Sequence, residues 1–328
     1  MSEEQVNQQP SNHELSQVIQ NIRQQVNSVL IGQDDIVEQT LVCLVAAGHL
    51  LLEGVPGIGK TLLVRSLARC FGGDFSRIQF TPDLMPSDVT GHAIYDPKSE
   101  KFRIRKGPVF TNLLLADEIN RAPAKTQASL LEVMQEQQIT IEGHSYSSTP
   151  PFMVMATQNP LEQEGTYPLP EAELDRFLMK VFVTYPSTED EVTLVKNVTT
   201  GKVNNDALLE GLTPQANPEH ILACQRAAAN LDVDDSLFEY AVRLAAATRE
   251  WSGIRMGASP RASIALIRCA RALAFIREQP FVSPDEVKSV ATGVLRHRIQ
   301  LSAEMEIEGI QADDVIADIL SHVEAPRK

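Results

Sequence analysis

The feature that most constrains this sequence is the run of residues 54–61, Gly-Val-Pro-Gly-Ile-Gly-Lys-Thr. A glycine, four residues and then Gly-Lys-Thr is the pattern typical of the loop that binds phosphate groups in nucleoside triphosphatases. Residues 49–53 before the loop are mostly apolar and predict a short buried strand. Residues 62–71 after it carry apolar side chains four apart and predict a helix, which a Gly-Gly pair ends. Because strand, glycine-rich loop and helix follow in that order, we expect an α/β fold whose loop binds phosphate.

The chemistry of this loop depends on its backbone and on two side chains. Its glycines allow successive N–H groups to point at phosphate oxygens, and the helix start adds the positive end of its dipole. Lys60 would bring a full positive charge to the outer phosphates, and the hydroxyl of Thr61 would ligate Mg²⁺. The predicted nucleotide-binding residues of this segment are Gly54, Val55, Pro56, Gly57, Ile58, Gly59, Lys60, Thr61 and Leu62.

Length and charge limit the class of protein. A chain of 328 residues predicts two domains. The formal net charge of −14 argues against a general nucleic-acid-binding surface, although it is compatible with a local basic patch.

The chain carries no pattern of export or membrane insertion. Residues 1–12 are polar and glutamine-rich, lack the basic-then-apolar pattern of a signal peptide and are predicted to be a disordered tail. No apolar run approaches the roughly 20 residues of a membrane span. The four cysteines are scattered, which favours buried thiols in a reducing compartment. We therefore expect a cytoplasmic protein.

The pattern of apolar residues divides the chain in two. Residues 13–205 are predicted to form an α/β nucleotide domain, and residues 206–328 an all-α domain. Two β-hairpins are predicted as insertions in the first domain, one around residues 93–105 and one around residues 138–148. Beyond residue 218 we expect helices to the end of the chain. Ser259-Pro260 and Ser283-Pro284 predict two helix starts there, each with a serine cap and a proline in the first turn.

Two acids and an amide follow the strands predicted next to the loop. Asp117 and Glu118 end the apolar strand 112–116, and Asn159 closes the core strand 151–156. The carboxyl ends of parallel strands lie beside the phosphate loop. Asp117 would hold Mg²⁺, Glu118 would activate the attacking water as general base, and Asn159 would hydrogen-bond the γ-phosphate or that water. Alone, these residues would more often be surface acids and a turn asparagine; the upstream loop favours catalysis.

Two arginines are candidates for contacts with phosphate. Arg176 precedes the apolar pair Phe177-Leu178, and an arginine supplied across an interface can stabilise charge on a transferring phosphoryl group. Arg261 lies near the start of a capped helix in the second domain, where it could contact phosphate and report the nucleotide state to that domain. Taken alone, either arginine would more often be a surface or salt-bridge residue.

Together the motifs resemble the MoxR family of AAA+ ATPases, over most of the chain and in the family's order. The resemblance implies a P-loop nucleotide domain with a parallel sheet and β-hairpin insertions, followed by an all-α lid domain. The stretches that carry it are Leu50–Thr61, Arg77–Gly91, Gly107–Lys125, Met155–Pro160, Leu169–Phe177 and Gly257–Arg261.

The resemblance also implies a role for each candidate residue. Ile31 and Gly32 resemble the motif on the adenine side of the nucleotide. The hairpin within residues 81–106 resembles the helix-2 insert, and that within residues 138–148 the pre-sensor-1 hairpin. The remaining matches are Gly54 to Thr61 with Walker A, Asp117 and Glu118 with Walker B, Asn159 with sensor 1, Arg176 with the arginine finger and Arg261 with sensor 2.

By the same resemblance the chain is expected to bind ATP and Mg²⁺ and to form a hexameric ring. Such rings couple ATP hydrolysis to remodelling or activating a partner protein, often one that contains a von Willebrand factor A domain with a metal site. Whether Arg261 would act on the nucleotide of its own chain or of a neighbour stays open.

Other functions remain as alternatives. A nucleic-acid motor is compatible with the basic residues of the first hairpin, although an acidic protein partner or solvent would also accommodate them. These residues are Lys98, Lys101, Arg103, Arg105 and Lys106. An ATPase subunit of a metal chelatase would share the architecture. A binding-only role is disfavoured because Lys60, Asp117 and Glu118 are all present.

Overall fold

The computed structural model describes residues 10–55, 57–160, 165–199 and 209–326. A five-stranded parallel sheet forms its centre, with the strand order β2-β5-β8-β1-β9. The strands are β1 (Leu50–Glu53), β2 (Phe75–Gln79), β5 (Leu113–Asp117), β8 (Met153–Gln158) and β9 (Met179–Phe182).

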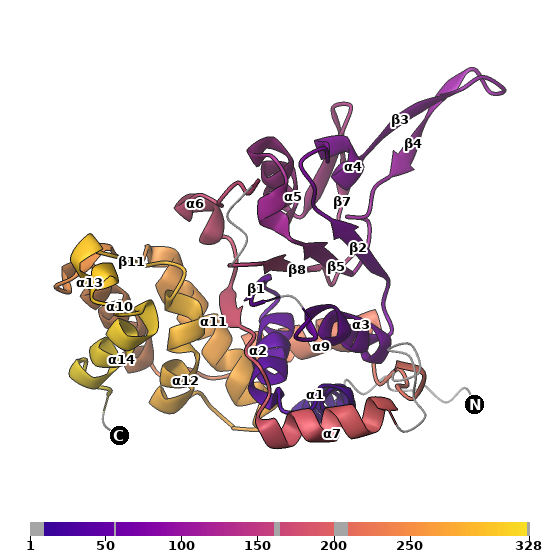
Figure 1. Cartoon of the computed structure of the whole chain (residues 1–328). Coiled ribbons are helices and arrows are strands. Elements are labelled where there is room, and N and C mark those ends of the chain that lie inside the picture. Colours follow the sequence, from indigo (N-terminus) through magenta and orange to yellow (C-terminus); the bar gives the residue numbers. More distant parts are fainter. Residues whose placement is uncertain (1–9, 56, 161–164, 200–208, 327–328) are drawn as a thin grey trace, which may run out of the picture.

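Helices cover both faces of this sheet (Figure 1). Successive residues of a strand point to opposite faces, so Leu50 and Leu52 pack into one apolar core while Leu51 packs into the other. The helices of the nucleotide domain are α1 (Asn12–Val29), α2 (Asp34–Val45), α3 (Lys60–Phe71), α4 (Pro86–Thr90), α5 (Ala124–Glu136), α6 (Glu171–Leu174) and α7 (Thr188–Thr199), with a 3-10 turn at Ile119–Arg121. The predicted α/β fold with a parallel sheet is confirmed.

Both predicted hairpins are present. β3 (Gly91–Asp96) pairs with β4 (Lys101–Lys106), and Figure 1 shows this hairpin projecting far from the sheet. β6 (Gln138–Ile141) pairs with β7 (His144–Ser147) through the two-residue turn Glu142-Gly143, in which both residues have positive φ. Such a turn matches the twist of a hairpin, and glycine adopts it without steric cost.

The start of α1 corrects the predicted tail. Residues 1–9 lie outside the described part of the chain. Ser11, however, caps α1: its side chain accepts from the N–H of Glu14, while the Glu14 carboxylate accepts from the N–H of Ser11 at 2.7 Å. Helix α1 therefore begins inside the segment 1–12 that the sequence predicted to be disordered, because this reciprocal cap satisfies the free N–H groups of the first turn.

The C-terminal region is helical but not entirely so. Its helices are α9 (Pro218–Ala229), α10 (Asp235–Glu250), α11 (Pro260–Ile276), α12 (Pro284–Leu295), α13 (Ala303–Ile307) and α14 (Ala312–His322). Two short strands, β10 (Ile254–Met256) and β11 (Gln300–Leu301), pair antiparallel between them. The expectation of helices to the end was wrong here, because three- and two-residue strands carry no periodicity and form only when distant segments meet.

The described N-terminal helices also pack against the lid. α1 and α2 share one apolar core with α9 and α11. Arg268 of α11 donates to the carbonyls of Ala46 and Ala47 at the end of α2, at 2.5 and 3.1 Å. A basic side chain at this helix end satisfies carbonyls that lack helical partners. Among the described residues, no helix combines the length and apolar character that a bilayer crossing requires.

His49 generates a prediction about stability. Its ring is buried; Nδ1 accepts from the Val154 N–H at 3.0 Å and Nε2 donates to the Met134 carbonyl at 3.1 Å. Burial lowers the pKa of His49 to about 4. Between about pH 6.5 and 4 the unfolded chain therefore binds a proton here that the folded chain does not. The contribution of neutral His49 to stability is complete above about pH 6.5 and is lost as the pH falls toward 4.

We expect His49→Asn to flatten this pH dependence. As the pH is lowered from about 6.5 to 4, the unfolding free energy of the parent chain should fall more steeply than that of the variant, by about 1.4 kcal/mol per pH unit. Denaturant titrations at several pH values measure both slopes. Parallel pH profiles for the two proteins would contradict the assignment.

Candidate nucleotide-binding site

The phosphate loop joins β1 to α3, as the sequence predicts. Gly59 caps α3 with φ 90° and Gly57 has φ 86°, a left-handed region that other residues adopt at a cost. Gly54 is required for space, because a Cβ there would lie 2.5 Å from the carbonyl oxygen of Val183. Pro56 lies outside the described residues. The α3 N-terminus therefore opens toward the inside of the loop, where its free N–H groups favour an anion.

Lys60 lies at the meeting point of two strands. Its Nζ donates to the carbonyl of Gly54 at 2.5 Å and to that of Gln158 at 3.3 Å. These carbonyls follow β1 and end β8, which are neighbours in the sheet. The ammonium group is thereby held at the carboxyl edge of the sheet, beside the loop.

A cavity of about 560 Å³ lies over this edge, within the size range of small-molecule sites. The loop, the Walker-type acids and the sensor-1 candidate all contribute to it. Of the predicted site residues, it is lined by Ile31, Gly57, Ile58, Gly59, Lys60, Thr61, Leu62, Asp117, Glu118 and Asn159. Gly32, Gly54 and Val55 are not in its lining.

Asp117 is fixed by side chains from both neighbouring strands. Its Oδ1 accepts from the hydroxyl of Thr157 on β8 at 2.6 Å, and its Oδ2 accepts from Arg77 on β2 at 2.7 Å. The carboxylate is therefore oriented before any ligand arrives. With the Thr61 hydroxyl it forms the oxygen-donor set that Mg²⁺ uses together with substrate phosphates. Both side chains line the cavity, so they could hold that ion.

Glu118 occupies a strained position at the end of β5. Its φ is 55°, in the left-handed region, which costs energy for a residue other than glycine and is frequent at functional sites. Its N–H donates to the Thr157 hydroxyl at 2.8 Å. Its carboxylate Oε2 accepts from Gln79 at 2.7 Å and forms an ion pair with Arg121 at 3.3 Å. A single hydroxyl, that of Thr157, thus orients both acids.

The part of the cavity next to Ile31 contains residues that the sequence reasoning missed. Gln33 is buried and donates from Nε2 to the Ile58 carbonyl at 3.0 Å, while its buried Oε1 has no hydrogen-bond partner among the described residues. Gly32 has φ 73°, and a Cβ there would lie 2.5 Å from the Asp190 carboxylate on α7. In the sequence, the polar Gln33 directly after Ile31-Gly32 was a signal from which this part of the site could have been predicted. The other unpredicted lining residues are Val29, Leu30, Tyr185, Pro186, Glu191 and Leu194.

The two candidate arginines lie elsewhere. Arg176 and Arg261 line a second cavity of about 280 Å³, which has no residue in common with the first. Arg176 is half-buried, and its NH1 donates to the Leu131 carbonyl at 2.8 Å. Arg261 is exposed at the start of α11. Within one chain, therefore, the structure brings the loop, the acids and Asn159 together and leaves both arginines outside.

Comparisons with known proteins identify the family. Residues 49–179 match the ATPase family associated with various cellular activities (AAA). Residues 246–319 match the AAA lid domain. The first match covers the sheet with its loop and acids, and the second covers most of the C-terminal helices.

Similar proteins span nearly the whole chain. The uncharacterized protein YeaC of Bacillus subtilis is 46% identical over 92% of this chain and 92% of its own length. Chaperone MoxR1 of Mycobacterium tuberculosis is 45% identical over 92% of this chain and 81% of its own. A crystal structure of a protein from Cytophaga hutchinsonii, assigned as an ATPase, is 42% identical with a TM-score of 0.88, over 96% of this chain and 97% of that one. The chain is therefore an ATP-hydrolysing enzyme that belongs to the MoxR family of AAA+ ATPases.

Proposed function

We propose that this ATPase uses Mg²⁺-bound ATP and hydrolyses it at a seam between two copies of the chain in a hexameric ring. The observation that carries the proposal is the separation of the site into two parts. Loop, acids and Asn159 line one cavity, whereas Arg176 and Arg261 line another. A phosphate held by the loop would meet these arginines only if a neighbouring copy supplied them.

Each residue of the first cavity would have a separate role in hydrolysis. The loop N–H groups and Lys60 bind the phosphates, and Thr61 and Asp117 would hold Mg²⁺, which neutralises phosphate charge when bound. Glu118 would take a proton from the attacking water, once its carboxylate turns from Gln79 and Arg121 to that water. Asn159 is buried at the cavity wall and would orient the γ-phosphate or the water.

The second cavity has the charge that a neighbour's triphosphate would need. Arg268 and Arg298 line it together with Arg176 and Arg261, in a chain of net charge −14. Asp175 also lines it and pairs with Arg298, so the cavity keeps a surplus of positive charge. Arg176 and Arg261 would both act in trans, on the γ-phosphate of the adjacent copy. Assembly would then switch hydrolysis on, because no arginine among the described residues lines the phosphate cavity of a single copy.

The ring would act as a cytoplasmic chaperone on a protein partner, in line with the name of the mycobacterial relative. The β3–β4 hairpin suits contact with a client, since Phe102 is 73% exposed. Its ring packs edge-on against that of Tyr95, with 5.4 Å between the ring centroids. Exposed apolar patches of this kind mark interaction sites. A client with a von Willebrand factor A domain is our specific proposal.

A nucleic-acid motor is the second candidate, favoured by one observation. The five basic residues of that hairpin named above are all exposed. Arg103 is partly neutralised by Asp96 at 3.0 Å. ATPase stimulation by single-stranded DNA, with a steep dependence on salt, would favour this function.

Arg176→Ala should bind ATP with the affinity of the parent chain and lose turnover by about 10³–10⁵-fold, because it removes only the charge that stabilises the transferring phosphoryl group. Fluorescent-nucleotide titration and steady-state phosphate release measure the two properties. Arg243→Ala, which removes an exposed arginine on α10, is the matched control. Parent-level turnover in Arg176→Ala would refute the assignment.

Mixing two inactive variants tests the seam directly. Glu118→Gln keeps its arginines and loses the general base, whereas Arg176→Ala keeps the loop and acids. In mixed rings, an Arg176→Ala copy beside a Glu118→Gln copy has a complete site, so turnover should exceed the sum of the separate proteins. No recovery at any mixing ratio would contradict supply of the arginine in trans.

Glu118→Gln should also retain its client in the presence of ATP, since bound nucleotide stays uncleaved. Affinity capture followed by mass spectrometry would identify that client, with Lys60→Ala as the control that loses nucleotide. We expect a protein. Recovery of nucleic acid in its place would favour the second candidate.

A further inference from the structure

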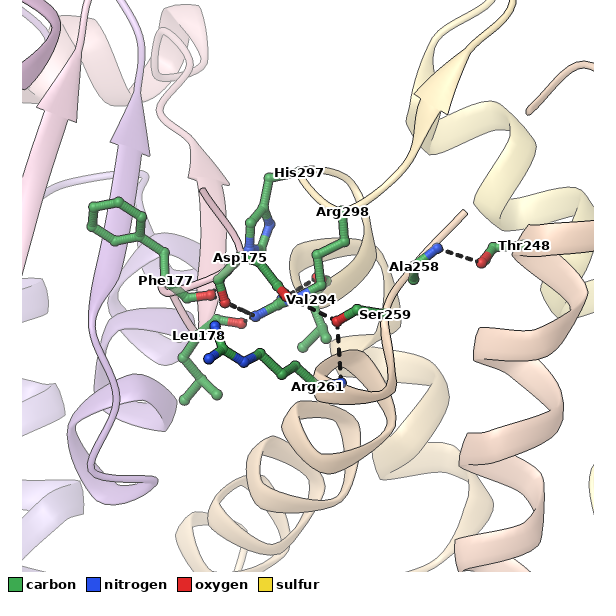
Figure 2. Close-up of polar contacts among 10 residues, drawn as sticks. All are labelled: Asp175, Phe177, Leu178, Thr248, Ala258, Ser259, Arg261, Val294, His297 and Arg298. Atoms are coloured by element: carbon green, nitrogen blue, oxygen red, sulfur yellow. Dashed lines mark hydrogen bonds and ion pairs between the residues drawn. The ribbon is translucent and has the colours of Figure 1, made fainter. Parts of the chain in front are cut away.

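Side chains of the lid hold Asp175, Phe177 and Leu178, the residues on either side of Arg176 in the sequence (Figure 2). Asp175, the preceding residue, forms an ion pair with Arg298, with 2.7 Å between Oδ1 and Nε. The side chain of Arg298 is 3% exposed and that of Asp175 is 17% exposed. Removing one partner of so buried a pair leaves an uncompensated charge, which is far more costly than losing a surface pair.

The same guanidinium holds the main chain on both sides of Arg176. It donates to the carbonyls of Asp175 at 3.3 Å, Phe177 at 2.6 Å and Leu178 at 3.1 Å. His297 adds a bond from Nε2 to the Phe177 carbonyl at 3.1 Å. Burial lowers the pKa of His297 well below its ordinary value, so its ring is neutral. The turn after α12 thus fixes the four-residue segment 175–178.

A second lid segment holds the other oxygen of the same carboxylate. The hydroxyl of Ser259 donates to Asp175 Oδ2 at 2.8 Å and accepts from the N–H of Arg261 at 3.2 Å. The residue before it, Ala258, donates its N–H to the Thr248 hydroxyl at 2.9 Å. Figure 2 shows Arg261 extending from the same helix start toward the core domain. One carboxylate therefore connects the backbones of both candidate arginines.

We propose that Asp175 is a positioning residue that, through Arg298 and Ser259, holds Arg176 and Arg261 in a single frame that moves with the lid. The inference rests on the proposed action of these arginines on a neighbouring copy. A displacement of about 1 Å at a transferring group can cost on the order of 100-fold in rate. The frame therefore sets turnover at the adjacent site while leaving nucleotide binding in its own chain untouched.

Two variants test this frame, and each has a matched control. Asp175→Asn removes the buried charge, and Ser259→Ala removes the second bond. Asp313→Asn breaks a different lid ion pair, that with Arg296 at 2.8 Å. Ser283→Ala removes the same kind of Ser-Pro helix cap, in which the hydroxyl accepts from the N–H of Asp285 at 3.2 Å. The controls measure what general loss of lid stability does to the enzyme.

We expect Asp175→Asn to lower kcat roughly 10- to 100-fold and Ser259→Ala to lower it less, with KM and ATP affinity within about twofold of the parent. The controls should lower Tm comparably and keep kcat. If Asp175→Asn does not fold, the kcat of Ser259→Ala alone tests the inference: a lowered kcat supports it and a parent-level kcat contradicts it. A loss of Tm with parent-level kcat would overturn the inference.

Mixed rings separate this inference from the proposed function. Asp175→Asn mixed with Glu118→Gln should regain turnover, because the second copy brings an intact frame to the first copy's nucleotide. The mixture of Arg176→Ala with Glu118→Gln is the reference. Recovery in the reference without recovery for Asp175→Asn overturns the positioning role alone. Failure of the reference overturns the seam, and the inference with it.

Discussion

The site depends on the parallel alignment of the central strands, which brings their carboxyl ends to one edge. Asp117 is held there by Thr157 from one neighbouring strand and Arg77 from the other. The Thr157 hydroxyl also accepts from the N–H of Glu118, so it fixes the intended metal ligand and the intended base together. Lys60 bonds to carbonyls of the same edge. The geometry of the sheet, more than any one side chain, makes the cavity suited to a triphosphate.

The charges of this molecule are arranged in two separate places. The first cavity is lined by one lysine and three acids, whereas the second is lined by four arginines and one acid, Asp175. The two acids of the site are already paired with arginines of their own chain, Asp117 with Arg77 and Glu118 with Arg121, whereas Arg176 lies in the second cavity. If Arg176 acts on a neighbouring copy, as we propose, its place in the second cavity makes catalysis depend on assembly. The lid contributes to the second cavity, where α11 and the turn after α12 hold the arginines, and its apolar core joins α11 to α1 and α2.

The sequence predicted those elements whose conformation depends on residues that are neighbours in the chain. The glycine loop, the hairpin turn at Glu142-Gly143 and the caps at Ser259 and Ser283 were all found where the sequence placed them. β9 was missed because Met179–Phe182 is short and becomes a strand only by pairing with β1. Gln33 and Tyr185 were missed at the site because nothing near them in sequence shows that they face the same cavity as Lys60.

The sequence by itself determined the chemistry: a phosphate loop, two acids, an amide and two arginines, in an order that resembles the MoxR family. Tertiary structure alone decided which of these groups share a cavity. Asp117 and Asn159 reach the loop because parallel strands bring their ends together over long separations in sequence. Arg176 does not, because Arg298 and Ser259 of the lid hold Asp175 and its neighbours at a different edge. The position of Arg176 thus depends on a buried ion pair between segments that are distant in sequence, which no local sequence pattern encodes.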